Sequence, residues 1–202
     1  MEEEKSPFIS TGFTDLDNKI GGLESEGITV VGACPAMGKT AWLMSLISYY
    51  IQEKTNQQNQ KIKPIFIFSL EMDAQSLMTL GTNHSENRVV ELSAISRELK
   101  IQAKDFSIPL LLLTQLNCSS DTRPDKRPIM SDFKESGAIK QDATNVILLY
   151  REEVCNKNSD SKGIGEFIIA KARNASIGSV KVQFNGACMH YSNLVKEKML
   201  SN

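Results

Sequence analysis

Short apolar runs alternate with longer amphipathic stretches along most of this chain. The short runs predict buried strands at residues 28–31, 64–69, 108–114 and 146–150. The longer stretches predict helices that begin at residue 14 and span residues 40–51, 87–106 and 131–142. Strands that alternate with helices pair in parallel, because each parallel crossover needs a covering helix. The pattern therefore predicts an α/β domain with a mostly parallel sheet flanked by helices.

Finer features of the pattern predict how some of these helices begin, end and pack. Thr14 and Asp17 have the spacing of a capping pair, and Gly21-Gly22 is expected to end the first helix. The helix at 40–51 is apolar on nearly every side, which predicts a position deep in the core. One stripe of the helix at 87–106 is expected to face the core, and it comprises Leu92, Ile95, Leu99, Ala103 and Phe106.

The C-terminal part of the chain has a different pattern. Residues 164–170 and 180–184 have strand-like apolar content, and in the second segment the apolar residues alternate with Lys181 and Gln183. Turn-forming residues lie between them at 174–178. These features predict a C-terminal β-hairpin added to the parallel sheet.

The composition fits one globular domain and limits how the protein can meet a partner. The chain has 202 residues, 41% of them hydrophobic, with 23 Lys+Arg, 24 Asp+Glu and a formal net charge of −1. A strongly basic surface is excluded, so any contact with nucleic acid needs a local patch or an assembled channel.

The sequence contains no segment that predicts a membrane protein or a secreted one. The longest apolar run, residues 108–113, is far shorter than the roughly 20 residues of a membrane-spanning helix. The first five residues are mostly acidic, unlike a secretory signal. We therefore expect a cytoplasmic protein without a membrane partner. The cysteines form no CxxC pair, so free thiols are expected at Cys34, Cys118, Cys155 and Cys188.

A phosphate-binding loop is predicted between the strand at 28–31 and the helix at 40–51. Its residues are Ala33, Cys34, Pro35, Ala36, Met37, Gly38, Lys39 and Thr40, and they follow the G-x-x-x-x-G-K-[ST] pattern except at the first position. In such a loop the backbone N–H groups surround an anion, and the lysine reaches the outer phosphates. The Thr40 hydroxyl is a candidate Mg²⁺ ligand. Alanine at position 33 is acceptable if its φ stays negative, whereas Gly38 is the position least tolerant of a side chain.

With this loop, a series of ordered segments resembles the C-terminal, RecA-like motor domain of bacterial DnaB-type replicative helicases. The matching segments are residues 11–17, 21–23, 35–40, 68–72, 95–100, 114–117, 125–128, 131–137, 141–143 and 169–174. The resemblance implies a single RecA-like P-loop ATPase domain over residues 1–202, with residues 1–10 as a tail. It also implies an ATP-dependent DNA helicase that uses ATP and Mg²⁺.

The resemblance assigns roles to four residues outside the loop. Glu71 follows a buried strand, which places a carboxylate at the carboxyl edge of the sheet, and it is similar to the glutamate that activates the attacking water. Gln115 ends another strand and is similar to the glutamine that senses the γ-phosphate. Lys171 and Arg173 resemble a pair that acts on nucleotide held by the neighbouring subunit, with the arginine as a finger.

The same resemblance implies DNA and protein partners. Lys134, Glu135, Ser136 and Gly137 resemble the loop that lines the channel of a homo-hexameric ring and holds single-stranded DNA. Lysine stands at position 134 where the family more usually has arginine, so the phosphate contact is expected to be weaker. Loader and primase proteins are further partners that the family implies.

The chain also departs from the family, and the departures leave alternative functions open. No four apolar residues are followed by aspartate, so the Walker B aspartate that orients Mg²⁺ is not found. Arg97 follows Glu71 by only 26 positions, which predicts an internal deletion near residues 78–87. Only ten residues precede Thr11, so the family's N-terminal domain is expected to be absent, and a ring is less expected from the shortened chain.

Two alternatives to an active motor follow from these departures. One is a hydrolysis-deficient relative that binds ATP or docks on an intact helicase ring. The other is a recombinase-like or clock-like RecA paralogue, and residues 125–128 and 131–137 argue against it.

Overall fold

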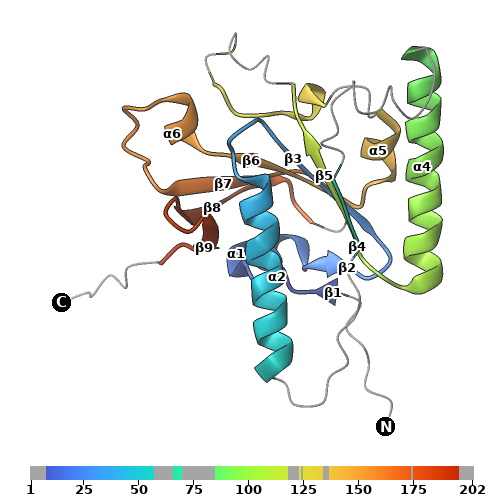
Figure 1. Cartoon of the computed structure of the whole chain (residues 1–202), viewed down its shortest axis with the longest axis horizontal. Coiled ribbons are helices and arrows are strands. Elements are labelled where there is room, and N and C mark those ends of the chain that lie inside the picture. The colour runs from blue at the N-terminus through green and yellow to red at the C-terminus, as the bar shows by residue number, and fades with distance from the viewer. Residues whose placement is uncertain are drawn as a thin grey trace.

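The protein, described by a computed structural model, contains a curved seven-stranded sheet with helices packed against it and a separate two-stranded sheet (Figure 1). The structure describes residues 8–56, 66–69, 85–117, 123, 125–133, 137–173 and 175–195. The strands are β1 (Phe8–Ile9), β2 (Leu23–Glu24), β3 (Ile28–Ala33), β4 (Phe66–Ser69), β5 (Leu110–Gln115), β6 (Asn145–Tyr150), β7 (Ile164–Ala172), β8 (Gly178–Asn185) and β9 (His190–Asn193). The helices are α1 (Thr14–Ile20), α2 (Lys39–Asn56), α4 (Ser85–Phe106), α5 (Gly137–Asp142) and α6 (Glu152–Cys155), with a 3-10 turn η2 (Met130–Asp132).

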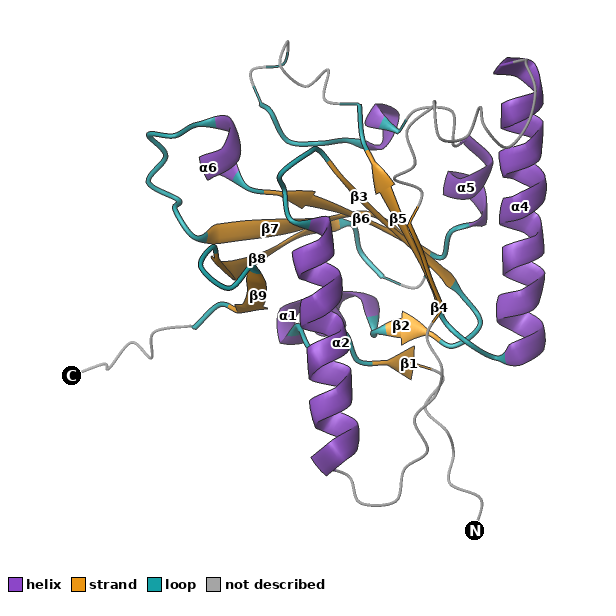
Figure 2. Cartoon of the chain, in the orientation of Figure 1, coloured by secondary structure: helices purple, strands orange, loops and turns teal. Residues whose placement is uncertain are grey.

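The sheet has a parallel half and an antiparallel half, in the order β4-β5-β3-β6-β7-β8-β9. Strands β4, β5, β3 and β6 run parallel, and β3 and β6 are buried along their whole length. Continuous apolar strands of this kind need cover on both faces. Figure 2 shows α4 and α5 at the end of the sheet near β4 and β5, away from α6 and β9. The predicted α/β fold with a mostly parallel sheet is confirmed.

The C-terminal hairpin is part of a larger antiparallel unit. Strands β7 and β8 pair as predicted, with residues 173–177 as the connection. A third strand, β9, continues the sheet beyond β8, and the sequence did not predict it. Only Tyr191 of its four residues is buried, so the segment lacks the apolar alternation that identifies a strand.

Aromatic side chains from distant parts of the chain meet where the two halves of the sheet join. The ring of Phe167 in β7 lies 5.0 Å from Phe13, 6.4 Å from Trp42 in α2 and 5.2 Å from Tyr191 in β9, measured between centroids. All three contacts are edge-on, the geometry in which aromatic rings attract. This aromatic cluster joins the residue before α1, helix α2 and strand β9 into one core.

The helix predicted at residues 131–142 is not continuous. Met130–Asp132 form the 3-10 turn η2, Phe133 is extended, and α5 covers only Gly137–Asp142.

Three further predictions about helices are wrong in detail. Asp17 does not cap α1 with Thr14; its carboxylate accepts hydrogen bonds from the hydroxyl and N–H of Thr11 instead, at 2.6 and 3.0 Å. Helix α2 is not buried all round, because Met44, Tyr49 and Ile51 are exposed. One face of a helix suffices to cover a sheet, and α2 uses Trp42 and Leu46 for that contact.

The buried stripe of α4 is also shifted from the predicted one. Leu99 and Ala103 are buried, but Ile95 and Phe106 are exposed. Ser96 takes the inward position next to them and donates a hydrogen bond of 3.0 Å to Asp142 of α5. Among the described residues, no helix is both long and apolar enough to cross a membrane.

Strand β4 pairs directly with β5, and this pairing sets the edge of the sheet. Phe66 lies opposite Leu110 and Ser69 opposite Leu113 in a parallel register. No strand lies between them in the described sheet. The three other parallel strands end in Ala33, Gln115 and Tyr150.

Candidate nucleotide-binding site

The predicted phosphate loop occupies the turn from β3 into α2. Ala33 ends β3 in extended conformation, so the alanine at this position costs nothing. Ala36 and Gly38 both have positive φ, 63° and 89°, which turns the chain tightly into the helix at Lys39. When residues in the left-handed backbone conformation alternate with residues in the right-handed one, successive backbone N–H groups point toward a single anion.

Backbone hydrogen bonds hold both ends of the loop. The N–H of Leu116 donates to the Ala33 carbonyl at 3.0 Å, which links the loop to the end of β5. The N–H of Trp42 donates to the Gly38 carbonyl at 2.9 Å and begins the hydrogen-bond ladder of α2. The loop therefore leaves the sheet and enters the helix in fixed positions.

Two side chains from outside the loop hold its middle. The guanidinium of Arg151 donates to the Ala36 carbonyl at 3.2 Å, and the Tyr191 hydroxyl donates to the Met37 carbonyl at 2.6 Å. Sequence reasoning missed both residues. The position of Arg151 directly after a buried strand is a signal that could have identified it, as it did for Glu71. No sequence signal marked Tyr191, because the strand that carries it, β9, was not predicted.

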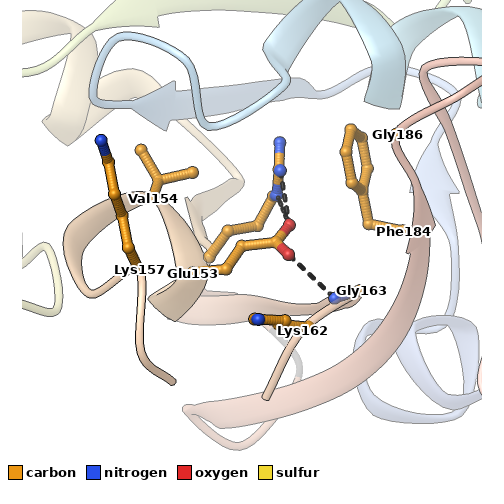
Figure 3. Close-up of a pocket in the computed structure, with 8 residues that line it drawn as sticks. Glu153, Val154, Lys157, Lys162, Gly163, Phe184 and Gly186 are labelled. Atoms are coloured by element: carbon orange, nitrogen blue, oxygen red, sulfur yellow. Dashed lines mark hydrogen bonds and ion pairs between the residues drawn. The ribbon is translucent and has the colours of Figure 1, made fainter. Parts of the chain in front are cut away.

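A hollow of about 490 Å³ opens beside the loop on the side of α6 (Figure 3). It is lined by Arg151, Glu153, Val154, Lys157, Lys162, Gly163, Phe184 and Gly186. The Glu153 carboxylate accepts hydrogen bonds from the Arg151 guanidinium and from the N–H of Gly163, each at 3.0 Å, and Figure 3 shows the one from Gly163. Burial by itself raises the pKa of Glu153, but the hydrogen bonds from Gly163 and Arg151 outweigh it, so the pKa lies below its ordinary value. The carboxylate is therefore charged and neutralises Arg151.

The loop residues fit phosphates, and one of them fits a metal ion. Lys39 and Thr40 stand at the first turn of α2, where the helix dipole favours negative charge. Thr40 is exposed, and its hydroxyl is the Mg²⁺ ligand that the sequence predicts. Magnesium bound beside a nucleotide takes most of its ligands from phosphates and water. The described part of the edge therefore suits a nucleotide with its metal.

Gln115 lies at the same edge as the loop, as predicted. It pairs in register with Ala33 across β5 and β3, and its side chain is exposed. Glu71, two positions after the end of β4, lies outside the described residues.

Lys171 and Arg173 come to the opposite end of the parallel strands from the loop. The Lys171 ammonium donates to the carbonyls of Lys140 and Gln141 at 2.7 and 2.8 Å, where α5 ends. Burial and the positive charges of Lys100 and Arg173 lower the pKa of Lys171. Arg173 is exposed and lies 3.9 Å from Glu24. The structure brings neither residue to the phosphate loop of the same chain.

Of the predicted DNA-contacting residues, only Gly137 is among those that the structure describes. It begins α5, while Lys134, Glu135 and Ser136 lie outside the described residues. The segment before them is held by Asp132, whose carboxylate accepts hydrogen bonds from Arg123 at 2.6 Å and from the N–H of Ile129 at 2.9 Å. The Asp132 carbonyl also accepts the N–H of Asn117, just after β5.

Replacing Asp132 with asparagine should destabilise the domain in a pH-dependent manner. Burial raises the pKa of Asp132, but the Arg123 and Ile129 hydrogen bonds lower it further, so the net pKa is below the ordinary value. A carboxyl of this kind stabilises the folded state above its unfolded pKa of about 4 and loses the effect as pH falls through the folded pKa. We expect a loss of about 1–3 kcal/mol at pH 7, shrinking below about pH 4, in urea unfolding.

The matched control is Asp125→Asn, because the Asp125 side chain is exposed and also pairs with an arginine, Arg127. It should change the unfolding free energy by less than about 0.5 kcal/mol. An Asp132→Asn loss that is the same at pH 7 and pH 3 would contradict the assignment.

One prediction about the cysteines is wrong. Cys34, the second residue of the loop, is disulfide-bonded in the structure, whereas Cys155 and Cys188 are free as expected. Cys118 lies outside the described residues. Spacing along the sequence cannot show a bond that depends on which segments the fold brings together.

Comparison with known proteins identifies related sequences over most of the chain. Residues 8–80 and 75–193 match the family described as DnaB-like helicase C terminal domain. The replicative DNA helicase DnaB of Haemophilus influenzae is 31% identical over 269 residues, covering 94% of this chain and 56% of that protein. DnaB of Geobacillus stearothermophilus is 32% identical over 253 residues, covering 87% of this chain and 54% of that protein. The chain thus spans about half the length of these relatives.

Several solved structures share the fold of this chain. One solved structure, described as an ATPase domain, has a TM-score of 0.73 and 25% identity, covering 96% of this chain and 94% of that one. A DnaB-like replicative helicase described with its interactions with primase has a TM-score of 0.77 and 22% identity, covering 96% and 63%. The RadB recombinase shares the fold alone, with a TM-score of 0.61 and 14% identity. The predicted RecA-like fold is confirmed.

Proposed function

This chain belongs to the family of DnaB-like helicase C-terminal domains, and from that membership we propose that it is the motor domain of a replicative DNA helicase. In this activity ATP binding and hydrolysis are coupled to translocation on single-stranded DNA during DNA replication. The phosphate loop carries the proposal, because it places converging N–H groups, Lys39 and the Thr40 hydroxyl at one edge of the sheet beside Gln115.

Each residue of the proposed site has a distinct task. Bound ATP with Mg²⁺ would supply the phosphoanhydride bond and a metal ion that neutralises its charge. The loop N–H groups and Lys39 would bind the phosphates, and Thr40 would hold the metal ion. The amide of Gln115 would sense the γ-phosphate, and Glu71 would activate the attacking water.

The proposed partners follow from the family. Lys134, Glu135, Ser136 and Gly137 contact the backbone of single-stranded DNA in the channel of a hexamer. Arg173, with Lys171, acts on nucleotide bound by the next subunit, which the exposure of Arg173 and its distance from its own loop support. A primase is a candidate partner, because a related structure is described with one. We place the protein in the cytoplasm.

A second candidate function is a hydrolysis-deficient relative that binds ATP or docks on an intact helicase ring. The direct pairing of β4 with β5 favours it, since it leaves no described strand to carry a Walker B aspartate between them. The comparisons support an internal deletion. The two family matches meet at residues 75–80, and 94% of 202 residues is about 190, which leaves about 79 of 269 matched positions without a residue here.

Steady-state ATP hydrolysis with Mg²⁺ and single-stranded DNA separates the two candidates. A motor should hydrolyse MgATP faster than about 1 s⁻¹ when single-stranded DNA is added, in the range typical of enzymes. The hydrolysis-deficient relative should bind MgATP but stay below that rate, because the magnesium-orienting aspartate is not found in the sequence. DNA-stimulated turnover well above that rate would establish the motor and show that another residue serves the metal. Failure to bind MgATP at millimolar concentration would reject the motor and the ATP-binding relative, and would leave docking on an intact helicase ring.

A further inference from the structure

We propose that Tyr191 and Arg151 are positioning residues of the phosphate loop. They hold the carbonyl groups of Met37 and Ala36 on the outer side of the loop, so that the Gly38 N–H, which follows Met37, stays available to phosphate. The Met37 N–H, which follows Ala36, instead donates to the Cys34 carbonyl at 3.3 Å. The inference rests on the proposed function, because it assumes that the loop binds nucleotide.

The Tyr191 hydroxyl is fixed in place from several directions. The side chain is 1% exposed, and its ring lies 5.2 Å from Phe167 and 4.8 Å from Phe184. The N–H of Tyr191 donates to the Ser45 hydroxyl at 2.8 Å, and that hydroxyl donates to the Ala41 carbonyl of α2 at 2.7 Å. Burial raises the pKa of Tyr191, so its hydroxyl keeps the proton that it donates to Met37.

Arg151 is fixed as firmly, and its charge is already neutralised. Its guanidinium lies 3.6 Å from the centroid of the Phe184 ring and donates to Glu153 at 3.0 Å through Nε. Its backbone N–H donates to the Met37 sulfur at 3.3 Å. Because Glu153 balances its charge, Arg151 fixes the position of the loop and adds little electrostatic attraction for phosphate.

Peptide geometry links these outer contacts to the inner face of the loop. In a trans peptide the C=O of one residue and the N–H of the next point in opposite directions. Holding the Met37 carbonyl on Tyr191 therefore turns the Gly38 N–H away from Tyr191, into the loop. Gly38, with φ of 89°, lacks a side chain that would resist rotation of this peptide. The Tyr191 hydroxyl supplies the restraint that the residue itself does not.

The Tyr191→Phe variant tests the inference, because it removes one hydroxyl and keeps the buried ring. We expect the Kd for MgADP to rise about 10-fold, the loss typical of one well-placed hydrogen bond that pre-orders a site. Inorganic pyrophosphate probes the loop without the nucleoside, and its Kd should rise by the same factor. Both are measured at a temperature where circular dichroism shows the variant folded, so that lower stability alone leaves Kd unchanged.

Matched variants make every outcome decisive. Tyr50→Phe makes the same change at a buried tyrosine near the far end of α2, and it should bind as the unaltered protein does. Arg151→Lys keeps the positive charge but loses the planar guanidinium that contacts Glu153 and Ala36 at the same time. It should raise the Kd for MgADP several-fold. If the unaltered protein binds, Lys39→Ala does not, and Tyr191→Phe binds normally, the inference fails while the proposed function stands.

The remaining outcomes are equally clear. If the unaltered protein binds no MgADP, the proposed function fails, and the inference fails with it. If Tyr191→Phe does not fold, an unchanged Kd for Arg151→Lys overturns the inference.

Discussion

Replacing Lys39 with alanine should weaken MgATP binding at least about 100-fold. Lys39 is the first residue of α2 and directly follows Gly38, so its ammonium group can reach phosphates held by the loop. Hydrogen bonds to a charged group contribute about 1.5–3 kcal/mol, and the upper part of that range corresponds to a 100-fold change in affinity. Equilibrium titration with a fluorescent ATP analogue in Mg²⁺ buffer measures the effect.

Lys104→Ala is the control for a general loss of positive charge. Lys104 is an exposed lysine in the last turn of α4, far in sequence from the loop. It should bind MgATP as the unaltered protein does. Since Lys39 is only 6% exposed, urea unfolding must accompany the titration to show that Lys39→Ala remains folded. An affinity within threefold of the unaltered protein would show that the loop does not bind phosphate through Lys39.

The largest expected effect on stability comes from Phe167→Ala. Phe167 is 0% exposed and contacts three other rings of the aromatic cluster, Phe13, Trp42 and Tyr191. Truncating a buried phenylalanine removes its transfer free energy and leaves a cavity, at a cost of about 3–5 kcal/mol. That is a large part of the roughly 5–15 kcal/mol by which a domain is stable. Urea unfolding followed by circular dichroism gives the difference.

Phe106→Ala provides the same chemical change on the surface. Phe106 ends α4 and is 70% exposed, so its loss should change the unfolding free energy by less than about 0.5 kcal/mol. A Phe167→Ala cost below about 1 kcal/mol would mean that the aromatic cluster does not join the two halves of the sheet.

Local sequence pattern sufficed to predict the part of the fold that carries the phosphate loop. The apolar run at β3, the glycine-lysine pair and the start of α2 are adjacent in sequence, so their structure depends on near neighbours. Gln115 could be placed beside the loop for a similar reason, because parallel strands bring their carboxyl ends to one edge.

Long-range contacts were the part that the sequence could not show. Ser96, not Ile95, faces the core, because its hydroxyl donates a hydrogen bond to Asp142 of α5. Helix α2 packs one side against the sheet and leaves the other exposed. A helix that is apolar on nearly every side does not show in its sequence which side will pack. Tyr191 was missed because its partners lie in other elements and its own strand is too short to leave a pattern.

The contact between Tyr191 and Met37 spans 154 positions of the chain, and the one between Asn193 and Gly12 spans 181. Contacts of such high sequence separation form late, because loop closure has to precede them. A ribosome makes the phosphate loop well before the strand that holds it. Nucleotide affinity would therefore be acquired only after β9 has docked, and a chain interrupted before β9 would carry the complete motif without its working geometry.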